Sequence, residues 1–368
     1  MIAQRTGRHC LALPSNRLGL YLALRHWTTP GQRLLMSPIS ADEILFLVLA
    51  AGLRPVIAPL SPRDGNIDPG TVLSGVDAVL TTNLYGLPDT ILSSPEISGK
   101  VVIEDVAHAL ETTVDGRPLG TFGAAGVFSL SKHPAAGSGG VLAVGTAADR
   151  NTLVKARDRL LVPGSFRAEL VSVASSMASQ AALKLDLMRP ALVLSRWLGM
   201  EEEREGYRIA LNAAGLGAAL RLAPELPPFD AWVRADLHDY RAGRGRLASW
   251  YQARRLAKVP GERARRLAGV RLLAELPSVA AAVPENLDQP LFRVPLLVED
   301  RDAAIAALER RGVATWYFYD PPYDDYAPGL TEPSPAPRAA RWWARHALPV
   351  DPLYARRALP LLKTLTPA

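Results

Sequence analysis

The sequence predicts an α/β protein whose first half forms a mostly parallel sheet and whose second half forms a smaller α+β unit. Short apolar runs alternate with helical stretches in the first half, the pattern of strands joined by covering helices. At 368 residues and 48% hydrophobic content, the chain is long and apolar enough for two packed domains. We therefore expect a larger domain over residues 1–205 and a smaller one over residues 206–368.

Six segments of the first half are predicted strands because they are apolar and end at turn residues. Segment 41–52 is a predicted helix that Gly52 would end by C-capping. The last two strands flank a glycine-rich loop and predict a local hairpin. Ligands of open α/β sheets bind beyond the carboxyl ends of the strands, so chemistry is expected in the loops that follow them. The predicted strands lie in segments 33–38, 54–60, 77–86, which ends in a glycine turn, 100–110, which is a strand followed by a loop, 126–131 and 141–145.

A long apolar helical region, residues 166–200, follows the predicted sheet and is interrupted by Pro190. Its charges are too frequent for a membrane span, so it predicts a buried or dimer-facing helix pair. A surface that rests on a membrane or on a lipid-linked substrate is the alternative. Further helices are expected at 234–256 and 301–312, with a strand between them at 289–300 and a leucine-rich helix at the end of the chain.

Composition argues against several classes of protein. The single cysteine, Cys10, cannot form an internal disulfide or a cysteine-rich metal cluster, which favours a reducing compartment and hence the cytoplasm. The N-terminal residues lack the apolar core of a secretory signal, and no run of about 18 apolar residues predicts a membrane span. Charges of both signs are interspersed around a net +6, without the basic stripe of a nucleic-acid-binding protein. The five histidines other than His108 lack the spacing of metal ligands, so no metal site is expected.

Asp105 is the first residue that points to chemistry. It directly follows an apolar strand, so its carboxylate would lie in the crevice where open α/β sheets bind ligands. A carboxylate buried there needs a cationic partner, and a protonated pyridine nitrogen would be one. Ala107 and His108 follow closely enough to meet the same ligand, the alanine against a ring face and the imidazole near the ring edge.

Lys132 is the second candidate. Ser129 and Ser131 precede it and a glycine turn at 137–140 follows it, so the backbone around the amine can approach a ligand closely. Desolvation of such a lysine lowers its pKa, which lets the amine act as a nucleophile and then as a base. Each feature alone is commonly structural, since an Asp at a strand end often caps a turn and a Lys before a turn is usually solvated. Their combination in this order is less ordinary.

Several motifs occur in the order found in one enzyme family. EDVAH (104–108) is followed by GTFGAAGVFSL (120–130), by Lys132 and by GSGG (137–140), and LTTNLYGLP (80–88) precedes them. These segments resemble the DegT/StrS family of sugar aminotransferases that depend on pyridoxal phosphate, and the likeness covers nearly the whole chain. The resemblance implies the type I aminotransferase fold, with a mostly parallel sheet of the seven-stranded type and a smaller α+β C-terminal domain.

The resemblance also implies roles for the matching residues. The cofactor would be pyridoxal 5'-phosphate, held by Lys132 as a Schiff base. Asp105 would pair with its pyridinium nitrogen, while Ala107 and His108 would contact the ring. These residues would make up the catalytic centre.

The cofactor's phosphate would be bound at several places. Ser129 or Ser131 would contact it, and Ser15 and Asn16 would do so from a helix N-terminus, which favours anions. Arg208 would reach it from the second subunit of a homodimer whose active sites lie at the interface. No other partner beyond a small-molecule amino donor and a keto acceptor is implied.

The implied activity is transfer of an amino group to a sugar-like keto acceptor, which could be nucleotide- or lipid-linked, in polysaccharide or natural product biosynthesis. An elimination or cyclisation enzyme that uses the same Lys132 is one alternative, and a degenerate member that binds the cofactor without turnover is another. Departures from the family keep these open. The chain is short at its N-terminus relative to the family, residues 37–43 offer no aromatic side chain to stack on the cofactor, and Ser138 replaces an acidic residue.

Overall fold

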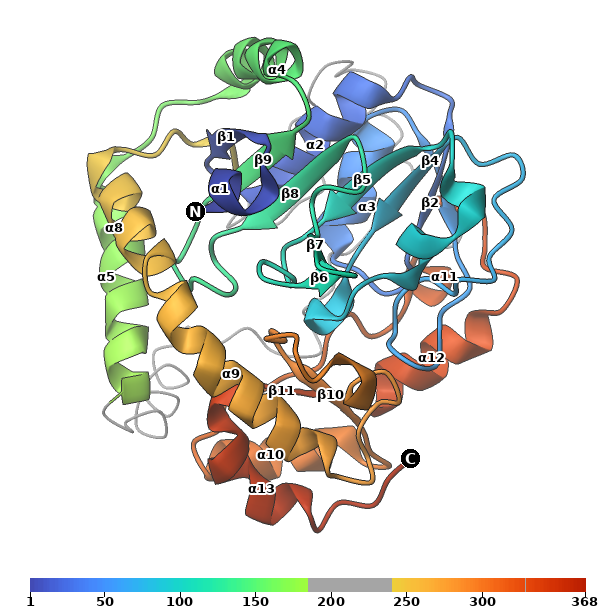
Figure 1. Ribbon diagram of the computed structural model, residues 1–368, viewed down its shortest axis with the longest axis vertical. Helices are drawn as coiled ribbons and strands as arrows, with labels where there is room; N and C mark the ends of the chain where they lie inside the picture. The colour runs from blue at the N-terminus through green and yellow to red at the C-terminus, as the bar shows by residue number, and fades with distance from the viewer. Residues whose placement is uncertain (185–239, 328) are drawn as a thin grey trace.

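The computed structural model describes residues 1–184, 240–327 and 329–368, and at its centre lies a seven-stranded sheet (Figure 1). Its strands are β1 (His9–Leu13), β2 (Arg33–Met36), β3 (Arg54–Ile57), β4 (Ala78–Thr81), β5 (Val101–Asp105), β8 (Ala125–Ser129) and β9 (Gly140–Val144). Their spatial order is β1-β9-β8-β5-β4-β2-β3. β9 runs antiparallel to both of its neighbours, whereas the other six strands run parallel. The carboxyl ends of the parallel strands therefore share one edge of the sheet.

Helix α2 (Asn16–Trp27) lies across this sheet and contacts β9, β8 and β5. Ser15 begins the helix by accepting a hydrogen bond from the backbone N–H of Leu18. A Cβ at Gly19 would lie 2.6 Å from the side chain of Val127, so glycine allows the helix to approach β8 closely. Helix α3 (Asp42–Ala50) packs beside α2, and its burial completes the main core. The packing of α2 thus sets where its N-terminus lies relative to β5 and β8.

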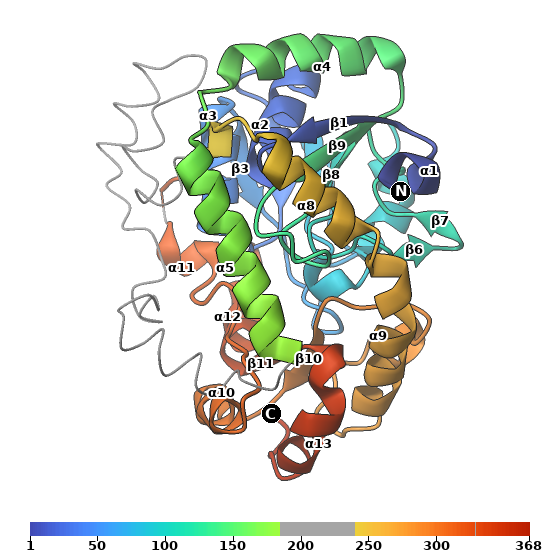
Figure 2. The ribbon, with the colours of Figure 1, turned by 90° about the vertical axis from the view of Figure 1, so that its left-hand side faces the viewer.

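Two long helices run side by side along one flank of the molecule (Figures 1 and 2). They are α5 (Phe166–Lys184) and α8 (Arg246–Leu256), and the chain continues from α8 into α9 (Val259–Ala274). Phe166 and Val171 of α5 are 68% and 67% exposed, so this helix presents apolar surface outward.

The C-terminal part is built around a two-stranded antiparallel sheet of β10 (Val294–Leu297) and β11 (Ala347–Val350). Trp343 is fully buried in its core and donates a hydrogen bond from Nε1 to the Tyr85 hydroxyl, 3.2 Å away, which ties this part to the loop after β4. The remaining helices and strands are α1 (Ile2–Thr6), β6 (Thr113–Val114), β7 (Arg117–Pro118), α4 (Ala147–Leu160), α10 (Arg301–Arg310), α11 (Tyr323–Tyr326), α12 (Pro337–His346) and α13 (Ala355–Leu362). Single 3-10 turns are η1 (Leu84–Gly86), η2 (Thr90–Ser93), η3 (Pro95–Ile97), η7 (Pro284–Asn286) and η8 (Pro352–Tyr354).

Most of the predicted elements are confirmed. Each of the six predicted strands in the first half overlaps an observed strand, and β8 pairs antiparallel with β9 as expected. The predicted helix 41–52 is α3, and Gly52 follows it with a φ of 79°, the left-handed conformation of a C-cap. The predicted helix 301–312 is α10, and the strand within 289–300 is β10.

Two details differ from the predictions. Strand β1 was not predicted, because a mostly apolar run of five residues is too short to distinguish a strand from other structures by its pattern. The predicted helix 234–256 is wrong over its first described residues, since α8 begins only at Arg246. Before it, Gly243 donates a backbone hydrogen bond to the carbonyl of Val162, 2.9 Å away, and this extended pairing replaces helix.

Two predicted features fall on residues 185–239, which lie outside the described residues. They are the second half of the apolar region 166–200 and the domain boundary at residue 205, so the division into two domains stays a prediction. Within the described ranges, none of the helices combines the length and the apolar character needed to cross a bilayer.

Candidate active site

Two neighbouring parallel strands bring Asp105 and Lys132 together. β5 ends at Asp105, which pairs with Val127 of β8, and Lys132 follows shortly after β8 ends. Both residues therefore lie beyond the same edge of the sheet. Beneath the larger effect of burial, the charge of Lys132 lowers the pKa of Asp105 and the charge of Asp105 raises the pKa of Lys132. The two charges thus influence each other's ionisation.

Asp105 is a buried carboxylate without a cation bonded to it among the described residues. It is 8% exposed, and its Oδ1 accepts hydrogen bonds from the backbone N–H of Ala107 at 3.0 Å and from Nδ2 of Asn16 at 3.1 Å. Burial raises the pKa of Asp105 to about 6, because these neutral donors and the more distant charges offset desolvation only in part. The position is suited to a ligand that brings a positive charge.

Lys132 carries an amine that is easily deprotonated. Desolvation and, after it, the charges of Arg17 and Arg293 lower the pKa of Lys132 to about 8, while Glu43 and Asp105 act in the opposite direction. About a tenth of the amine is then uncharged at pH 7, far more than for a solvated lysine. Such an amine can act as a nucleophile and carry a proton at Nζ.

The N-terminus of α2 lies beside Asp105. Asn16 donates from Nδ2 both to Asp105 and to the carbonyl of Val127 at 3.2 Å, so its side chain holds the carboxylate against the sheet. Ser15 donates to the carbonyl of Tyr240 at 3.0 Å. A Cβ at Gly140 would lie 2.7 Å from the backbone nitrogen of Asn16, so glycine lets the turn of the predicted GSGG motif meet this helix end. A phosphate contact from Ser15 or Asn16 stays a prediction.

Three further charged or polar groups, Arg17, Glu43 and Tyr240, meet at the same end of α2. Glu43 accepts a hydrogen bond from Arg17 Nη2 at 3.0 Å and another from the Tyr240 hydroxyl at 3.1 Å. Burial alone would raise the pKa of Glu43, but Arg17, hydrogen bonds and Lys132 bring it below its ordinary value. Glu43 is therefore ionised and contributes negative charge beside Lys132.

The two candidate phosphate-binding serines lie together. The hydroxyls of Ser129 and Ser131 are 2.9 Å apart, and the backbone N–H of Ser131 donates to the Ser129 hydroxyl at 3.3 Å. Ser129 is buried whereas Ser131 is exposed. Both belong to the segment between β8 and Lys132, so the choice between them stays open.

His108 lies among aromatic rings of the C-terminal part. Its ring stacks on Phe292 at a centroid distance of 5.0 Å and on Phe318 at 5.4 Å. Burial holds the pKa of His108 well below its ordinary range, so the imidazole is neutral, and its Nδ1 has no hydrogen-bond partner among the described residues. His133 is equally buried, and desolvation lowers its pKa to about 3. Contact of His108 and Ala107 with a cofactor ring stays a prediction.

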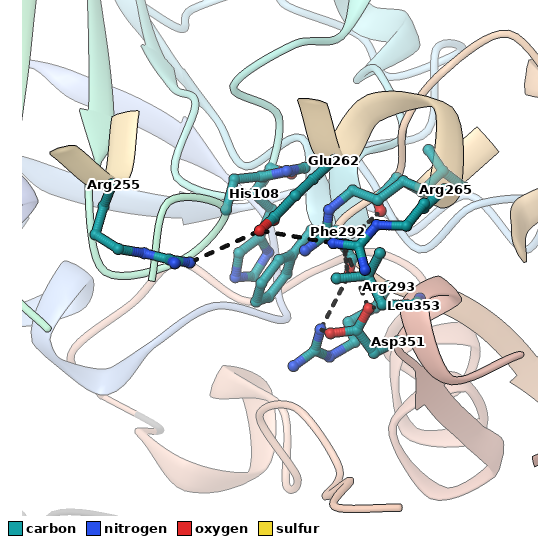
Figure 3. Close-up of polar contacts among 11 residues, drawn as sticks. His108, Arg255, Glu262, Arg265, Phe292, Arg293, Asp351 and Leu353 are labelled. Atoms are coloured by element: carbon teal, nitrogen blue, oxygen red, sulfur yellow. Dashed lines mark hydrogen bonds and ion pairs between the residues drawn. The ribbon is translucent and has the colours of Figure 1, made fainter. Parts of the chain in front are cut away.

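A cluster of two arginines and a carboxylate in the C-terminal part lies beside the aromatic rings around His108. Arg293 directly precedes β10 and pairs with Asp351 at 2.5 Å (Figure 3). Arg266 of α9 pairs with the same carboxylate at 3.3 Å. The charge of Arg293 contributes to lowering the pKa values of Lys132 and His108. Arg208, which was predicted to reach the phosphate, lies outside the described residues.

The comparisons with known proteins decide the family. The family model described as the DegT/DnrJ/EryC1/StrS aminotransferase family matches residues 3–200, more than half of the chain. The chain belongs to this family. The recognition made from the sequence motifs is thereby confirmed.

The curated relatives of this DegT-family chain match it over part of its length. The spore coat polysaccharide biosynthesis protein SpsC of Bacillus subtilis (strain 168) is 32% identical over 145 residues, which is 37% of either chain. A UDP-N-acetyl-3-dehydro-alpha-D-glucosamine 3-aminotransferase of Acidithiobacillus ferrooxidans is 30% identical over 154 residues, 38% of this chain and 41% of that protein. The matched segments thus span well under half the length of these relatives.

Among solved structures, the similarity extends along the whole chain. PseC of Helicobacter pylori, an aminotransferase involved in the biosynthesis of pseudoaminic acid, superposes with a TM-score of 0.66 at 16% identity, covering 99% of this chain and 88% of PseC. At this identity the likeness establishes the fold. The predicted type I aminotransferase fold is confirmed.

Several residues of the site were not singled out in the sequence. Arg17 directly follows the predicted pair Ser15 and Asn16, and Glu43 ends the segment 37–43 that lacks an aromatic residue, so their positions were near features already noted. No local pattern marks the others, because they come from distant segments that only packing brings close. The residues missed are Arg17, Glu43, Tyr240, Arg266, Arg293 and Asp351.

Proposed function

We propose that this DegT-family chain is a pyridoxal-phosphate-dependent aminotransferase that transfers an amino group to a keto-sugar-like acceptor. The observation that carries the proposal is the meeting of Lys132 and Asp105 beyond the ends of the adjacent strands β5 and β8. An amine with a lowered pKa and a buried carboxylate without a bonded cation among the described residues are the two groups that the opposite ends of a protonated pyridine aldehyde require.

The donor set fits pyridoxal phosphate. Asp105 offers a buried carboxylate whose described bonds come only from neutral donors, which suits a pyridinium N–H. The hydroxyls of Ser129 and Ser131 and the N-terminus of α2 supply donors for a phosphate, and Gly140 permits the close approach that such a site needs. When bound, the cofactor supplies an aldehyde for amines and a ring that withdraws electrons.

The chain's own residues supply orientation and proton transfer. Lys132 offers an amine at Nζ that can attack a carbonyl carbon while uncharged and later hold or return a proton. Asp105 keeps a positive charge in place through its carboxylate, and Asn16 and Ala107 keep that carboxylate oriented. The neutral imidazoles of His108 and His133 add no competing charge, since burial keeps the pKa values of both below their ordinary range.

The finer points of the proposal rest on the relatives. The names of SpsC and of the 3-aminotransferase of Acidithiobacillus ferrooxidans support a sugar-like, nucleotide-linked acceptor and polysaccharide biosynthesis. A lipid-linked acceptor and natural product biosynthesis stay predictions. We further propose two domains, 1–205 and 206–368, and a homodimer in which Arg208 serves the neighbouring site. The exposed apolar side chains of α5, Phe166, Leu170, Val171 and Met177, support a partner surface. A cytoplasmic location stays a prediction.

The visible spectrum of the purified protein tests the activity. We expect the protein to turn yellow on addition of pyridoxal phosphate and to bleach with an amino donor such as L-glutamate. Lys132→Ala should lose the lysine-dependent band, whereas Lys155→Ala, an exposed lysine on α4, should behave as the wild type. Retained colour that no amine bleaches would favour an elimination or cyclisation enzyme, and a wild-type protein that takes up no cofactor would contradict the proposal.

A further inference from the structure

The turn that follows Lys132, residues 133–139, is held by two helices that come later in the chain. Three of its backbone carbonyls accept hydrogen bonds from side chains of α5 and α8, the helices that run side by side in Figures 1 and 2. The bonds run from Ser176 Oγ to Ala135 at 3.0 Å, from Arg255 Nε to Pro134 at 2.6 Å and from Gln252 Nε2 to Ser138 at 3.2 Å. Side chains from outside the sheet therefore fix the course of this turn.

Lys132 lies inside the loop that these bonds hold. Its carbonyl accepts a hydrogen bond from the backbone N–H of Ala135 at 3.0 Å, so the residue that Ser176 holds also binds Lys132. The backbone N–H of Leu130 donates to the carbonyl of Gly139 at 3.0 Å and closes the loop on its other side. A movement of the turn would therefore move the backbone of Lys132 and change the direction of its side chain.

The conformation of Ala135 depends on such support. Its φ is 49°, in the left-handed region, which is unfavourable for a residue that carries a Cβ. Backbone in that region persists only where the surrounding structure holds it there. A Cβ at Gly137 would lie 3.3 Å from the Cβ of Ser176, so the turn already packs directly against α5. Without the bond from Ser176, we expect Ala135 to relax to an ordinary φ and Lys132 to lose its fixed position.

A buried carboxylate joins the two helices. Glu169 of α5 is 8% exposed and accepts a hydrogen bond from the backbone N–H of Ala248, in the first turn of α8. The N-cap of α8 is Gly245, which has no side chain to cap the helix, so Glu169 supplies the cap and a favourable negative charge. The hydroxyls of Tyr251 and Ser176 lie 3.0 Å apart and form a second link. Ser176 is thus placed by both helices.

We propose that α5 and α8 form a clasp that positions Lys132, with Ser176, Arg255 and Gln252 as its positioning residues. The clasp is the set of three side-chain bonds to the turn. That the positioned amine receives a cofactor rests on the proposed function, whereas the hold on the Lys132 backbone rests on the bonds alone. The inner face of α5 therefore serves the active site, while its outer face carries the exposed apolar side chains.

The clasp has a consequence for the ionisation of Lys132. Desolvation is the largest cause of the lowered pKa of this amine. If the turn is released, the amine becomes better solvated, so its pKa should rise toward the ordinary value. The charged groups that act on the amine are Arg17 and Glu43 near the N-terminus of α2, Asp105 of β5 and Arg293 of the C-terminal part, and none of them belongs to the clasp.

The pH dependence of pyridoxal phosphate uptake tests the clasp in the full chain. S176A and R255M each remove one donor. In both, the midpoint of uptake should move upward by about one pH unit and uptake at pH 7 should slow about tenfold, because one pKa unit changes the uncharged fraction tenfold. S176T keeps the hydroxyl and should restore the wild-type midpoint. S175A and R254M, at exposed neighbours on the same helices, should behave as the wild type. Unchanged midpoints in S176A and R255M overturn the proposal.

Labelling of the cofactor-free protein provides an independent readout. Acetic anhydride modifies uncharged amines, so the reactivity of Lys132 across pH, measured by mass spectrometry against the exposed Lys155, reports its midpoint. A midpoint, unlike a rate, does not change with access to the amine alone. The same upward shift in S176A and R255M supports the clasp, and equal profiles overturn it. If R255M does not fold, which circular dichroism detects, S176A decides.

The two readouts separate this proposal from the proposed function. A wild type that takes up no pyridoxal phosphate, with the labelling midpoint of Lys132 still raised in S176A, would contradict the proposed function and leave the clasp standing. A wild type that takes up the cofactor, with the same midpoint in every variant, would overturn the clasp and leave the proposed function standing.

Discussion

Asp105 and Asp351 are both buried carboxylates, yet their surroundings act on their pKa values in opposite directions. Asp105 accepts hydrogen bonds from neutral donors, and burial raises its pKa to about 6. Burial would raise the pKa of Asp351 as well, but Arg293 and Arg266 bring it below its ordinary value. Among the described residues, Asp105 has no positively charged side chain bonded to it, whereas Asp351 is paired with two arginines. A buried carboxylate without a bonded cation is suited to a ligand that carries a positive charge, such as a pyridinium cofactor.

The largest effect that tests this comparison is expected from Asp105→Asn. The amide can accept the same two hydrogen bonds but cannot neutralise a pyridinium, so affinity for pyridoxal phosphate should fall about a hundredfold or more. Titration of the visible absorbance measures it. Asp115→Asn, a change at an exposed carboxylate of the turn between β6 and β7, should leave the affinity unchanged. Equal affinity in the two variants would remove Asp105 from the cofactor site.

The next effect concerns stability without the cofactor. Asp351→Asn leaves Arg266 and Arg293 buried without a counter-charge and should lower the free energy of unfolding by about 3 kcal/mol. Asp105→Asn should leave it unchanged or raise it, because it removes a desolvated charge. Urea unfolding of both variants, with the exposed Glu299→Gln as a control, measures the contrast. Destabilisation by Asp105→Asn of the same size would contradict the comparison.

The two carboxylates should also contribute to pH dependence with opposite signs. The pKa of Asp105 is raised from 3.8 to about 6, so the folded state binds more protons in that interval and stability decreases as pH rises through it, by about 2 to 3 kcal/mol. The lowered pKa of Asp351 gives a contribution that is present above the ordinary value and lost as pH falls through the folded value. The stability that Asp105→Asn gains over the wild type should thus be absent below about pH 4, develop as pH rises from about 4 to 6.5 and persist above that range. A gain that does not vary with pH would argue against ionisation as its cause.

The two regions also differ in how far the sequence predicts them. Asp105 ends β5 and Lys132 follows β8, and these two strands are adjacent and parallel. The apolar pattern of the two strands is enough to place both residues at one edge of a sheet. Arg293 and Asp351 come from segments 58 residues apart that meet only because β10 pairs with β11. Local patterns carry no signal for such a pairing, so the half of the site that came from the C-terminal part was missed. Glu43 is a different case, because the feature that marks its segment, residues 37–43, is the lack of an aromatic side chain, and no pattern there singles out the carboxylate.

The smallest expected effect is on the ionisation of Lys132, and it tests whether Arg17 and Glu43 belong to the site. After desolvation, the charge of Arg17 contributes most to holding the pKa of Lys132 at about 8, and Glu43 opposes it. Uptake of pyridoxal phosphate requires the uncharged amine, so its rate should rise with pH through a midpoint near 8. Arg17→Gln should move that midpoint upward and Glu43→Gln should move it downward, because each removes one opposing charge. Stopped-flow absorbance across pH measures the midpoints. Shifts of the same sign in the two variants would mean that changes in packing, and not the removed charges, determine the pKa of the Lys132 amine.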